Sequence, residues 1–371
     1  MRGRMPAGER EARMAWSRIS EPADPKAFEL VREAGAEGAL AAVLGGTARD
    51  GARFMPRLET LDIDHDLRVA AKVQARVVVP GDDEWPAGLD DLEVPPHCLW
   101  VRGTEHLGGG CERSAAIVGA RSATHYGEAT ANDIAAGLCE RAFSVVSGAA
   151  FGIDGAAHRG ALAVQGVTVA VLAGGVERAY PDAHRGLLEK IVATGAVVSE
   201  VPPGCAPTRW RFLRRNRLIA AMTRGTVVVE AGLRSGSRST AGEATKLARV
   251  VAAVPGPVTS AVSAGCHELI RSGEAALVTD AAEVAELLGD LGTDLAPVKR
   301  GQDRPEDVLG AVESVVWSAL PVRAAAGVAA LAVRTALAER DVLACLGRLE
   351  LLGLARRDGD AWRRPARQPS G

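Results

Sequence analysis

Arginines and aromatic residues cluster between Arg209 and Arg217. The nine residues read Arg-Trp-Arg-Phe-Leu-Arg-Arg-Asn-Arg, so five guanidiniums alternate with Trp210 and Phe212. Guanidiniums bind phosphates and aromatic rings stack on bases, which together suit non-specific contact with a single nucleic-acid strand. The alternative is the start of an amphipathic helix, in which Phe212 and Leu218 point inward and the arginines lie along a solvated face. We favour a phosphate-binding groove, because such a local excess of one charge is unusual in a chain of net charge -2.

Turns rich in Gly and Ser follow several apolar runs of the chain. Gly119-Ala120-Arg121-Ser122 directly follows one run, and Ser235-Gly236-Ser237 comes shortly after another. At the carboxyl ends of parallel strands, helix N-termini offer free N–H groups, and glycine lets the backbone approach a ligand closely. One such turn is ordinary in an α/β protein. Several turns together, with Arg121 beside them, predict a site for an anionic ligand.

Recognisable catalytic or cofactor patterns are missing from the sequence. Neither G-x-G-x-x-G nor G-x-x-x-x-G-K-[ST] follows any of the apolar runs. Asp154 and His158 are four residues apart on an expected helix, which permits an acid/base pair. We favour a structural interpretation, with Asp154 as an N-cap and His158 hydrogen-bonded to its surroundings. We therefore expect no enzymatic activity, no metal and no cofactor.

Short β-branched runs alternate with Ala-rich helical segments from Cys98 onward. Continuous apolar strands that alternate with helices predict an α/β fold with a doubly wound, mainly parallel sheet. The expected strands are Cys98 to Val101, Ala115 to Val118, Ser144 to Val146, Val167 to Leu172, Ala196 to Val198, Thr226 to Val229 and Val250 to Val254.

The flanks of this α/β region have a different pattern. Residues 1–75 carry helical periodicity and predict a small helical region, and residues 76–289 form the α/β domain. Residues 290–305 mix Gly, Pro, Asp and Lys without periodicity, which is typical of a linker. Residues 306–371 contain helical segments followed by an Asp-Gly turn, a pattern that predicts a winged-helix-like domain.

Composition limits the class of protein. The chain has 371 residues, 47% of them hydrophobic and 24% charged, as in an ordinary globular protein with two or three domains. The apolar stretches are interrupted by Gly, Gln and Pro and do not resemble a membrane helix of ~20 residues, and the N-terminus lacks a secretory signal. Six cysteines without a C-x-x-C pair argue against a zinc site. We expect a cytoplasmic protein that does not contact membranes.

An ordered set of motifs resembles the DNA-processing protein A family (DprA, also called Smf). The resemblance covers roughly residues 77–288. The motifs are Ile117-Val118-Gly119-Ala120-Arg121, Tyr126-Gly127, Ser147-Gly148-Ala149-Ala150-Phe151-Gly152-Ile153-Asp154 with Ala157-His158 and Ala161-Leu162, Tyr180-Pro181, Ser199-Glu200, Arg215-Asn216-Arg217, Glu230, Ser235-Gly236-Ser237, Thr240-Ala241 and Pro255-Gly256.

The resemblance implies a protein that binds single-stranded DNA, forms a homodimer and loads a RecA-type recombinase in natural transformation and homologous recombination. It also implies that the α/β domain is an extended Rossmann-like domain, with a sterile-alpha-motif-like N-terminus and a winged-helix C-terminus. The candidate DNA-binding residues are Arg121, Ser122, Arg209, Phe212, Arg215, Asn216, Arg217, Ser235, Gly236 and Ser237. The last three would bind a backbone phosphate.

Several residues depart from the family pattern. Leu213 stands where Pro is usual, Phe151 where a charged residue is common, and His267 where Asn is usual. Arg238 and Ser239 replace two apolar residues beside the Ser-Gly-Ser turn. These changes bear on the shape of the groove and leave its glycines intact.

Two alternative functions follow from the same residues. A Rossmann-like nucleotide or nucleoside-monophosphate hydrolase would use Glu230 or Asp154 as its acid/base residue, but it would not need the arginine-aromatic cluster. A C-terminal reader of duplex DNA would place Glu339 and Asp341 against phosphates, so a protein-interaction or structural role suits that domain better.

Overall fold

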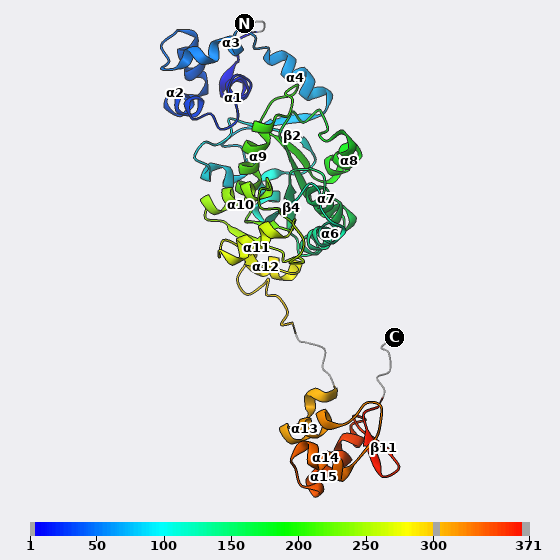
Figure 1. Cartoon of the computed structure of the whole chain (residues 1–371). Coiled ribbons are helices and arrows are strands. Elements are labelled where there is room, and N and C mark those ends of the chain that lie inside the picture. Colours follow the sequence, from blue (N-terminus) through cyan, green and yellow to red (C-terminus); the bar gives the residue numbers. More distant parts are fainter. Residues whose placement is uncertain (1–3, 300–304, 366–371) are drawn as a thin grey trace. The chain divides into compact units, whose positions relative to one another are not determined.

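Two compact units make up the chain. They span Met1–Ala296 and Pro297–Gly371. The computed structural model, shown in Figure 1, describes residues 4–299 and 305–365. Within those residues, no helix is both long and apolar enough to cross a membrane.

A nine-stranded sheet forms the centre of the large unit, in the order β1-β2-β6-β5-β4-β3-β7-β8-β9. The strands are β1 (Ala75–Val78), β2 (Leu99–Gly103), β3 (Ser114–Val118), β4 (Ser144–Ser147), β5 (Thr168–Leu172), β6 (Ala196–Ser199), β7 (Gly225–Val228), β8 (Val250–Ala253) and β9 (Ala276–Leu277). Strands β3 to β9 pair in parallel, whereas β2 runs antiparallel to both β1 and β6. The expected mainly parallel sheet is confirmed, but its two outer strands, β1 and β9, are not among the strands expected from the sequence.

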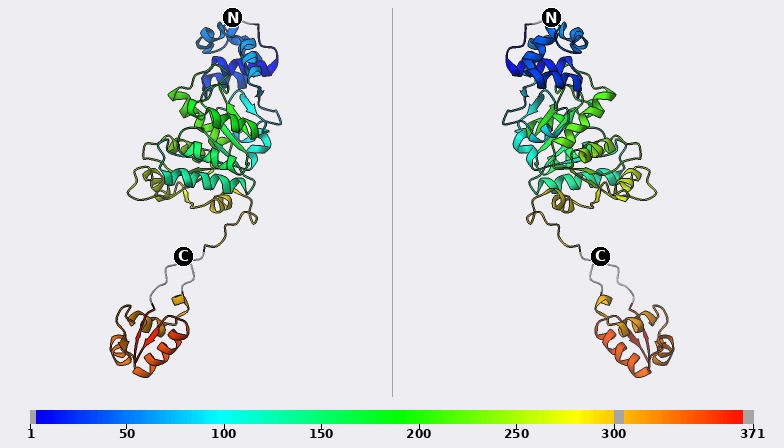
Figure 2. Two further views of the ribbon diagram at one scale, coloured as in Figure 1. Left: turned by 90° about the vertical axis from the view of Figure 1, so that its right-hand side faces the viewer. Right: turned by 90° about the vertical axis from the view of Figure 1, so that its left-hand side faces the viewer.

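Helices cover both faces of this sheet, as the two views of Figure 2 show. They are α5 (Leu107–Glu112), α6 (His125–Cys139), α7 (Ile153–Ala163), α8 (Arg185–Thr194), α9 (Arg209–Ala221), α10 (Ser237–Lys246), α11 (Ala264–Arg271) and α12 (Ala281–Leu288). Alternate residues of β3 point to opposite faces of the sheet and pack in different hydrophobic clusters. Ile117 packs with α6, α7 and α12, whereas Ala116 and Val118 pack with α9, α10 and α11. Because side chains alternate between the two faces of a strand, each face of the sheet is covered by its own layer of helices. The Gly-Ser turns at the strand ends therefore lie between these two layers.

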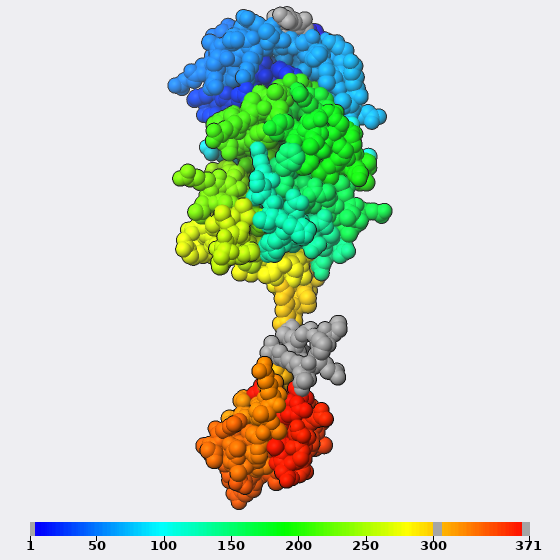
Figure 3. Space-filling model, turned by 45° about the vertical axis from the view of Figure 1, so that its right-hand side comes forward, coloured from blue at the N-terminus to red at the C-terminus, as the bar shows by residue number. Residues whose placement is uncertain are grey.

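The N-terminal helices pack directly on the sheet of the large unit. They are α1 (Gly8–Ile19), α2 (Pro25–Leu44), α3 (Met55–Leu58) and α4 (Ile63–Lys72). Asp24 caps α2 by accepting from the backbone N–H of Lys26 at 3.0 Å, with Pro25 at the first helical position. Trp16 shares one hydrophobic cluster with Trp100 and Leu172 of the sheet. The surface of these helices is continuous with that of the α/β region in Figure 3.

The predicted linker begins inside the large unit. Arg113 pairs with Asp294 at 2.6 Å and with Asp290 at 3.3 Å, and Arg224 pairs with Asp290 at 2.9 Å. The segment 290–294 is therefore tied to the α/β region by ion pairs. Of the predicted linker 290–305, residues 300–304 lie outside the described residues.

The small unit contains α13 (Ala311–Ala319), α14 (Val328–Thr335) and α15 (Glu339–Leu351). Strands β10 (Ala326–Gly327), β11 (Arg356–Asp358) and β12 (Ala361–Arg363) form a separate sheet in the order β10-β12-β11. Val316, Leu331, Leu346 and Trp362 are buried in its core. The assignment of this unit as a winged helix stays a prediction.

Candidate nucleic-acid interface

A groove of about 680 Å³ opens at the carboxyl ends of β3 and β7. These strands are neighbours, but the chain proceeds from β3 through β4, β5 and β6 on one side before it returns to β7 on the other. Ligands of open α/β sheets bind at such a switch in strand order, since the loops on its two sides diverge there. The lining includes Gly119, Ala120, Arg121, Ser122, Ala150, Asp154, Tyr180, Thr208, Arg209, Phe212, Arg215, Asn216, Arg234, Ser235, Gly236 and Ser237.

Helix α9 carries the arginine-aromatic cluster to this groove. Thr208 caps the helix by accepting from the backbone N–H of Arg211 at 3.2 Å. The arginines then diverge because successive helical residues point in different directions. Arg209 is exposed and lines the groove, whereas Arg211 leaves it and pairs with Glu21 at 3.0 Å. The guanidinium of Arg214 lies 4.2 Å from the ring centre of Trp210.

Arg215 forms part of the groove wall from a buried position. Its guanidinium donates to the carbonyl of Val171, and it lies so close to Gly148 that a Cβ there would collide with it. Burial lowers the pKa of Arg215 to about 10, against the attraction of the nearby Asp154 carboxylate. The side chain therefore remains a cation at neutral pH. Burial also raises the pKa of Asp154.

Arg217 does not reach the groove, and its predicted role as a DNA contact needs correction. Its side chain is only 7% exposed and forms an ion pair with Glu200. It also donates to the carbonyl of Val94 at 2.9 Å. Arg215 and Arg217 are two residues apart on a helix and cannot share a face. Arg217 therefore holds α9 against neighbouring segments.

Phe212 lies at the groove wall and is only partly buried. Its ring centre is 5.3 Å from that of Tyr180, and the guanidinium of Arg121 lies 5.0 Å from the same ring. The alternative that turned Phe212 into the core together with Leu218 is therefore wrong for Phe212, while Leu218 is buried. An aromatic ring next to an exposed cation can stack on a base while the cation contacts phosphate.

The Ser-Gly-Ser turn also lines the groove, at the point where α10 begins. The hydroxyls of Ser235 and Ser237 are 2.7 Å apart, and Asn216 donates to the carbonyl of Gly236 at 3.4 Å. A Cβ on Gly236 would meet nothing within 4 Å, so the backbone there is open to the groove. The first N–H groups of a helix favour an anion. Asn216 thus aligns this turn with α9.

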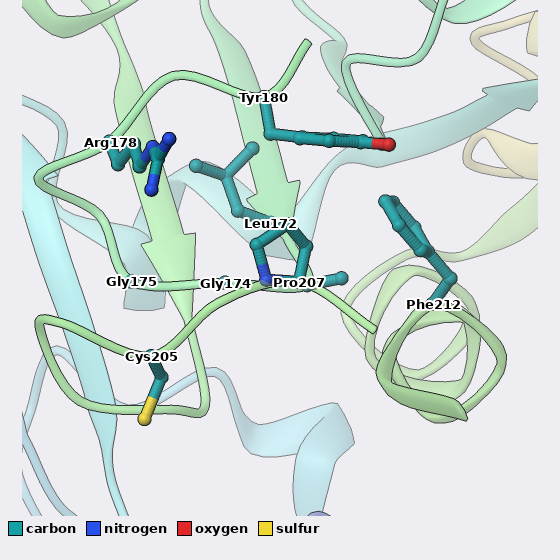
Figure 4. Close-up of a pocket in the computed structure, with 10 residues that line it drawn as sticks. Leu172, Gly174, Gly175, Arg178, Tyr180, Cys205, Pro207 and Phe212 are labelled. Carbon is teal, nitrogen blue, oxygen red and sulfur yellow. The ribbon is translucent and has the colours of Figure 1, made fainter. Parts of the chain in front are cut away.

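A narrow side pocket adjoins the groove and is shown in Figure 4. Its volume is about 10 Å³, and it shares Tyr180, Pro207 and Phe212 with the groove. The rings of Tyr180 and Phe212 lie on one side of this pocket, and Arg178 lies on the other. Tyr180 and Arg234, which line the groove, are not among the candidate DNA-binding residues expected from the sequence. The Tyr180-Pro181 motif and the position of Arg234 just before Ser235 were the available signals.

The residues considered for acid/base chemistry have structural partners. The Nδ1 of His158 is 2.7 Å from the hydroxyl of Thr168, and burial lowers the pKa of His158 to about 3. Glu230 accepts from the backbone N–H of Thr124 at 2.9 Å and from its hydroxyl at 2.6 Å. Within residues 4–299 and 305–365, no three His, Cys, Asp or Glu side chains are grouped to hold a metal.

Comparison with known proteins places these features in a family. Residues 76–289 match the family model of DNA recombination-mediator protein A. The chain is 46% identical to a DNA processing protein DprA of Mycobacterium tuberculosis over 366 residues, 94% of this chain and 93% of that protein.

Two solved structures resemble the chain. DNA processing protein A of Streptococcus pneumoniae has a TM-score of 0.66 and 32% identity, covering 76% of this chain and 99% of that one. The Helicobacter pylori protein, whose structure concerns its single-stranded DNA binding mode, has a TM-score of 0.51 and 26% identity, covering 57% and 94%. The chain therefore belongs to the DNA recombination-mediator protein A family, whose members include the DNA processing proteins DprA and Smf.

Proposed function

We propose that this chain binds single-stranded DNA in the groove between the strand ends of β3 and β7. The observation that carries this proposal is the joint placement of the Arg121 guanidinium and the Phe212 ring at one wall. Arg209 and Arg215 supply further cations, and Ser235-Gly236-Ser237 with the start of α10 supplies hydroxyls and N–H groups for a phosphate. Ser122 and Asn216 complete the proposed contact surface.

The wider role that we propose is protection of single-stranded DNA and loading of a RecA-type recombinase in natural transformation and recombination. The protein would act as a homodimer in the cytoplasm. Membership of a recombination-mediator family supports this role. The Helicobacter pylori relative, studied for its single-stranded DNA binding mode, supports the choice of ligand.

We infer a binding function without catalysis. Glu230, one of the two candidate acid/base residues of a nucleotide hydrolase, already accepts two hydrogen bonds from Thr124. Asp154 lines the groove, but its carboxylate accepts from the backbone N–H of Ala150 at 3.3 Å. A pocket for a single nucleotide would not need the arginine-aromatic cluster of residues 209–217.

A gel-shift comparison of single-stranded and duplex DNA at two salt concentrations tests this proposal. We expect tighter binding of the single strand, with an affinity that falls as salt rises because phosphate contacts release counterions. Equal binding of both DNA forms, or no binding, would contradict the proposal.

A further inference from the structure

Phe151 and His184 form an aromatic pair on the surface beside the groove. Their ring centres are 4.9 Å apart at an interplanar angle of 66°. The imidazole Nδ1 lies 3.0 Å from the carbonyl of Ala149, which fixes the orientation of the ring. Phe151 is 49% exposed, so about half of a large apolar side chain faces water. Such a residue contributes little to the core and is available to a ligand.

Two segments connect this pair to the groove wall. Ala150 lines the groove and immediately precedes Phe151. Tyr180 also lines the groove, packs on Phe212, and begins the segment that ends in the short helix Asp182–His184. The aromatic pair is thus close in the chain to two residues that line the proposed DNA site, Ala150 and Tyr180.

An exposed arginine, Arg159, lies beside the same pair. A Cβ built on Gly155 would lie 2.8 Å from Cε1 of His184 and 3.2 Å from Nη1 of Arg159, so both groups lie against this glycine. Arg159 approaches Glu128 at 3.7 Å, with 47% and 44% of their side chains exposed. Exposed ion pairs of this kind contribute little, so the guanidinium can exchange its partner for a phosphate.

We propose that Phe151 and His184 form a second stacking platform that takes a base of the same DNA strand outside the groove, with Arg159 contacting the adjoining phosphate. This inference rests on the proposed function. It assigns a contact to Phe151, a residue at which the chain departs from the family pattern. A strand that occupies the groove and continues over Phe151 and His184 contacts the protein along a longer stretch than the groove alone provides.

The test measures the affinity of the full chain for oligothymidylates of roughly 4 to 16 nucleotides. We expect Phe151→Ala to bind the shortest oligonucleotides as the parent does and to bind the longest about 5- to 150-fold more weakly, the range for loss of one base stack. Phe151→Tyr should retain the parent affinity, since it keeps the ring. Leu44→Ala, which removes another exposed apolar side chain far along the sequence, is the matched control.

A crosslinking experiment identifies the contact directly. With 5-iodouracil in the oligonucleotide, we expect adducts on the peptide containing Phe151 for long strands only. Parent affinity of Phe151→Ala for every length, while Arg121→Ala binds all lengths more weakly, would overturn the platform and leave the groove intact. A parent protein that binds no single strand would instead overturn the proposed function. A changed sedimentation coefficient of Phe151→Ala would assign the exposed ring to an interface between protein copies and would also overturn the platform.

Discussion

Arg217 and Glu200 form an ion pair in the interior of the large unit, with 7% and 10% of their side chains exposed. Arg217 comes from α9, and Glu200 directly follows β6. Arg217 also donates to the carbonyl of Val94, in the segment between β1 and β2. The pair therefore holds in place the helix that carries Arg209 and Phe212 to the groove. Its role is to position α9.

Changing Arg217 to Ala should destabilise the protein rather than weaken its phosphate contacts. The change leaves the buried Glu200 carboxylate without its cation, which costs about 3 to 5 kcal/mol of unfolding free energy. Denaturant unfolding measures this loss. The salt dependence of single-strand binding by the folded fraction should stay that of the parent.

The control replaces both members of the pair, as Arg217→Met with Glu200→Leu. Removing two paired charges together avoids an isolated buried charge, so this double variant should be more stable than Arg217→Ala alone. A folded Arg217→Ala protein of parent stability, with a reduced salt slope, would instead show that Arg217 contacts a phosphate.

Arg121→Ala and Arg209→Ala should act through charge at the groove. Both side chains are exposed and line the groove, so their loss should leave the unfolding free energy nearly unchanged. Each variant should lower the magnitude of the salt slope by about 0.7 for each lost single-strand phosphate contact. Arg340→Ala, an exposed arginine of the small unit, serves as the control. Slopes equal to that of the parent would refute the phosphate role.

Phe212→Ala should weaken binding through loss of stacking. The expected loss of binding free energy is about 1 to 3 kcal/mol with little change in the salt slope, because stacking releases no counterions. Since Phe212 is only partly buried, the loss of stability should be smaller than the about 3 to 5 kcal/mol of a core aromatic. Phe212→Tyr retains a ring and should bind nearly as the parent does. Normal affinity of a folded Phe212→Ala protein would exclude stacking.

The sheet and the groove could be predicted because their signals are local in sequence. Continuous apolar runs such as Ser114–Val118 read as buried strands, and the turn after each strand marks the ligand edge. β9 (Ala276–Leu277) is too short to give such a run, and β1 (Ala75–Val78) is an edge strand of mixed burial. The shortness of β9 and the mixed burial of β1 explain why neither strand was predicted.

Which arginines of α9 line the groove and which pair with other segments could not be predicted. Five arginines in nine residues have the same chemistry, and only the packed structure shows that Arg211 pairs with Glu21 and Arg217 with Glu200. These partners lie 190 and 17 residues away in sequence. A local cluster therefore predicted a basic surface but not which guanidiniums belong to it.

Truncation after Ala296 should leave a folded protein that binds single-stranded DNA with parent affinity. The groove residues all lie in the large unit, Met1–Ala296. Truncation after Leu288, the natural choice from sequence, should be less stable because it removes Asp290 and Asp294, the partners of Arg113. Thermal unfolding and gel shifts on both truncations test this difference. Loss of binding in the folded longer truncation would place the small unit in the DNA site.

The ion pair of Arg113 and Asp294 should make stability depend on pH in a defined direction. The Arg113 guanidinium lowers the pKa of Asp294 to about 2, below the value of about 3.9 for an unfolded Asp. The unfolded state therefore takes up this proton first as pH falls, so the stabilisation is complete above pH ~4 and disappears as pH approaches ~2.

Unfolding of the parent and of Asp294→Asn, measured at several pH values in this window, tests the assignment. The parent should be more stable than the variant at neutral pH, and the difference should shrink as pH falls through the window. Glu274→Gln, which removes a different exposed carboxylate of the large unit, controls for the change in net charge. A difference between parent and Asp294→Asn that stays constant from neutral pH to pH ~2 would show that Asp294 acts through its backbone contacts, such as the 2.8 Å hydrogen bond from the N–H of Asp290, and not through Arg113.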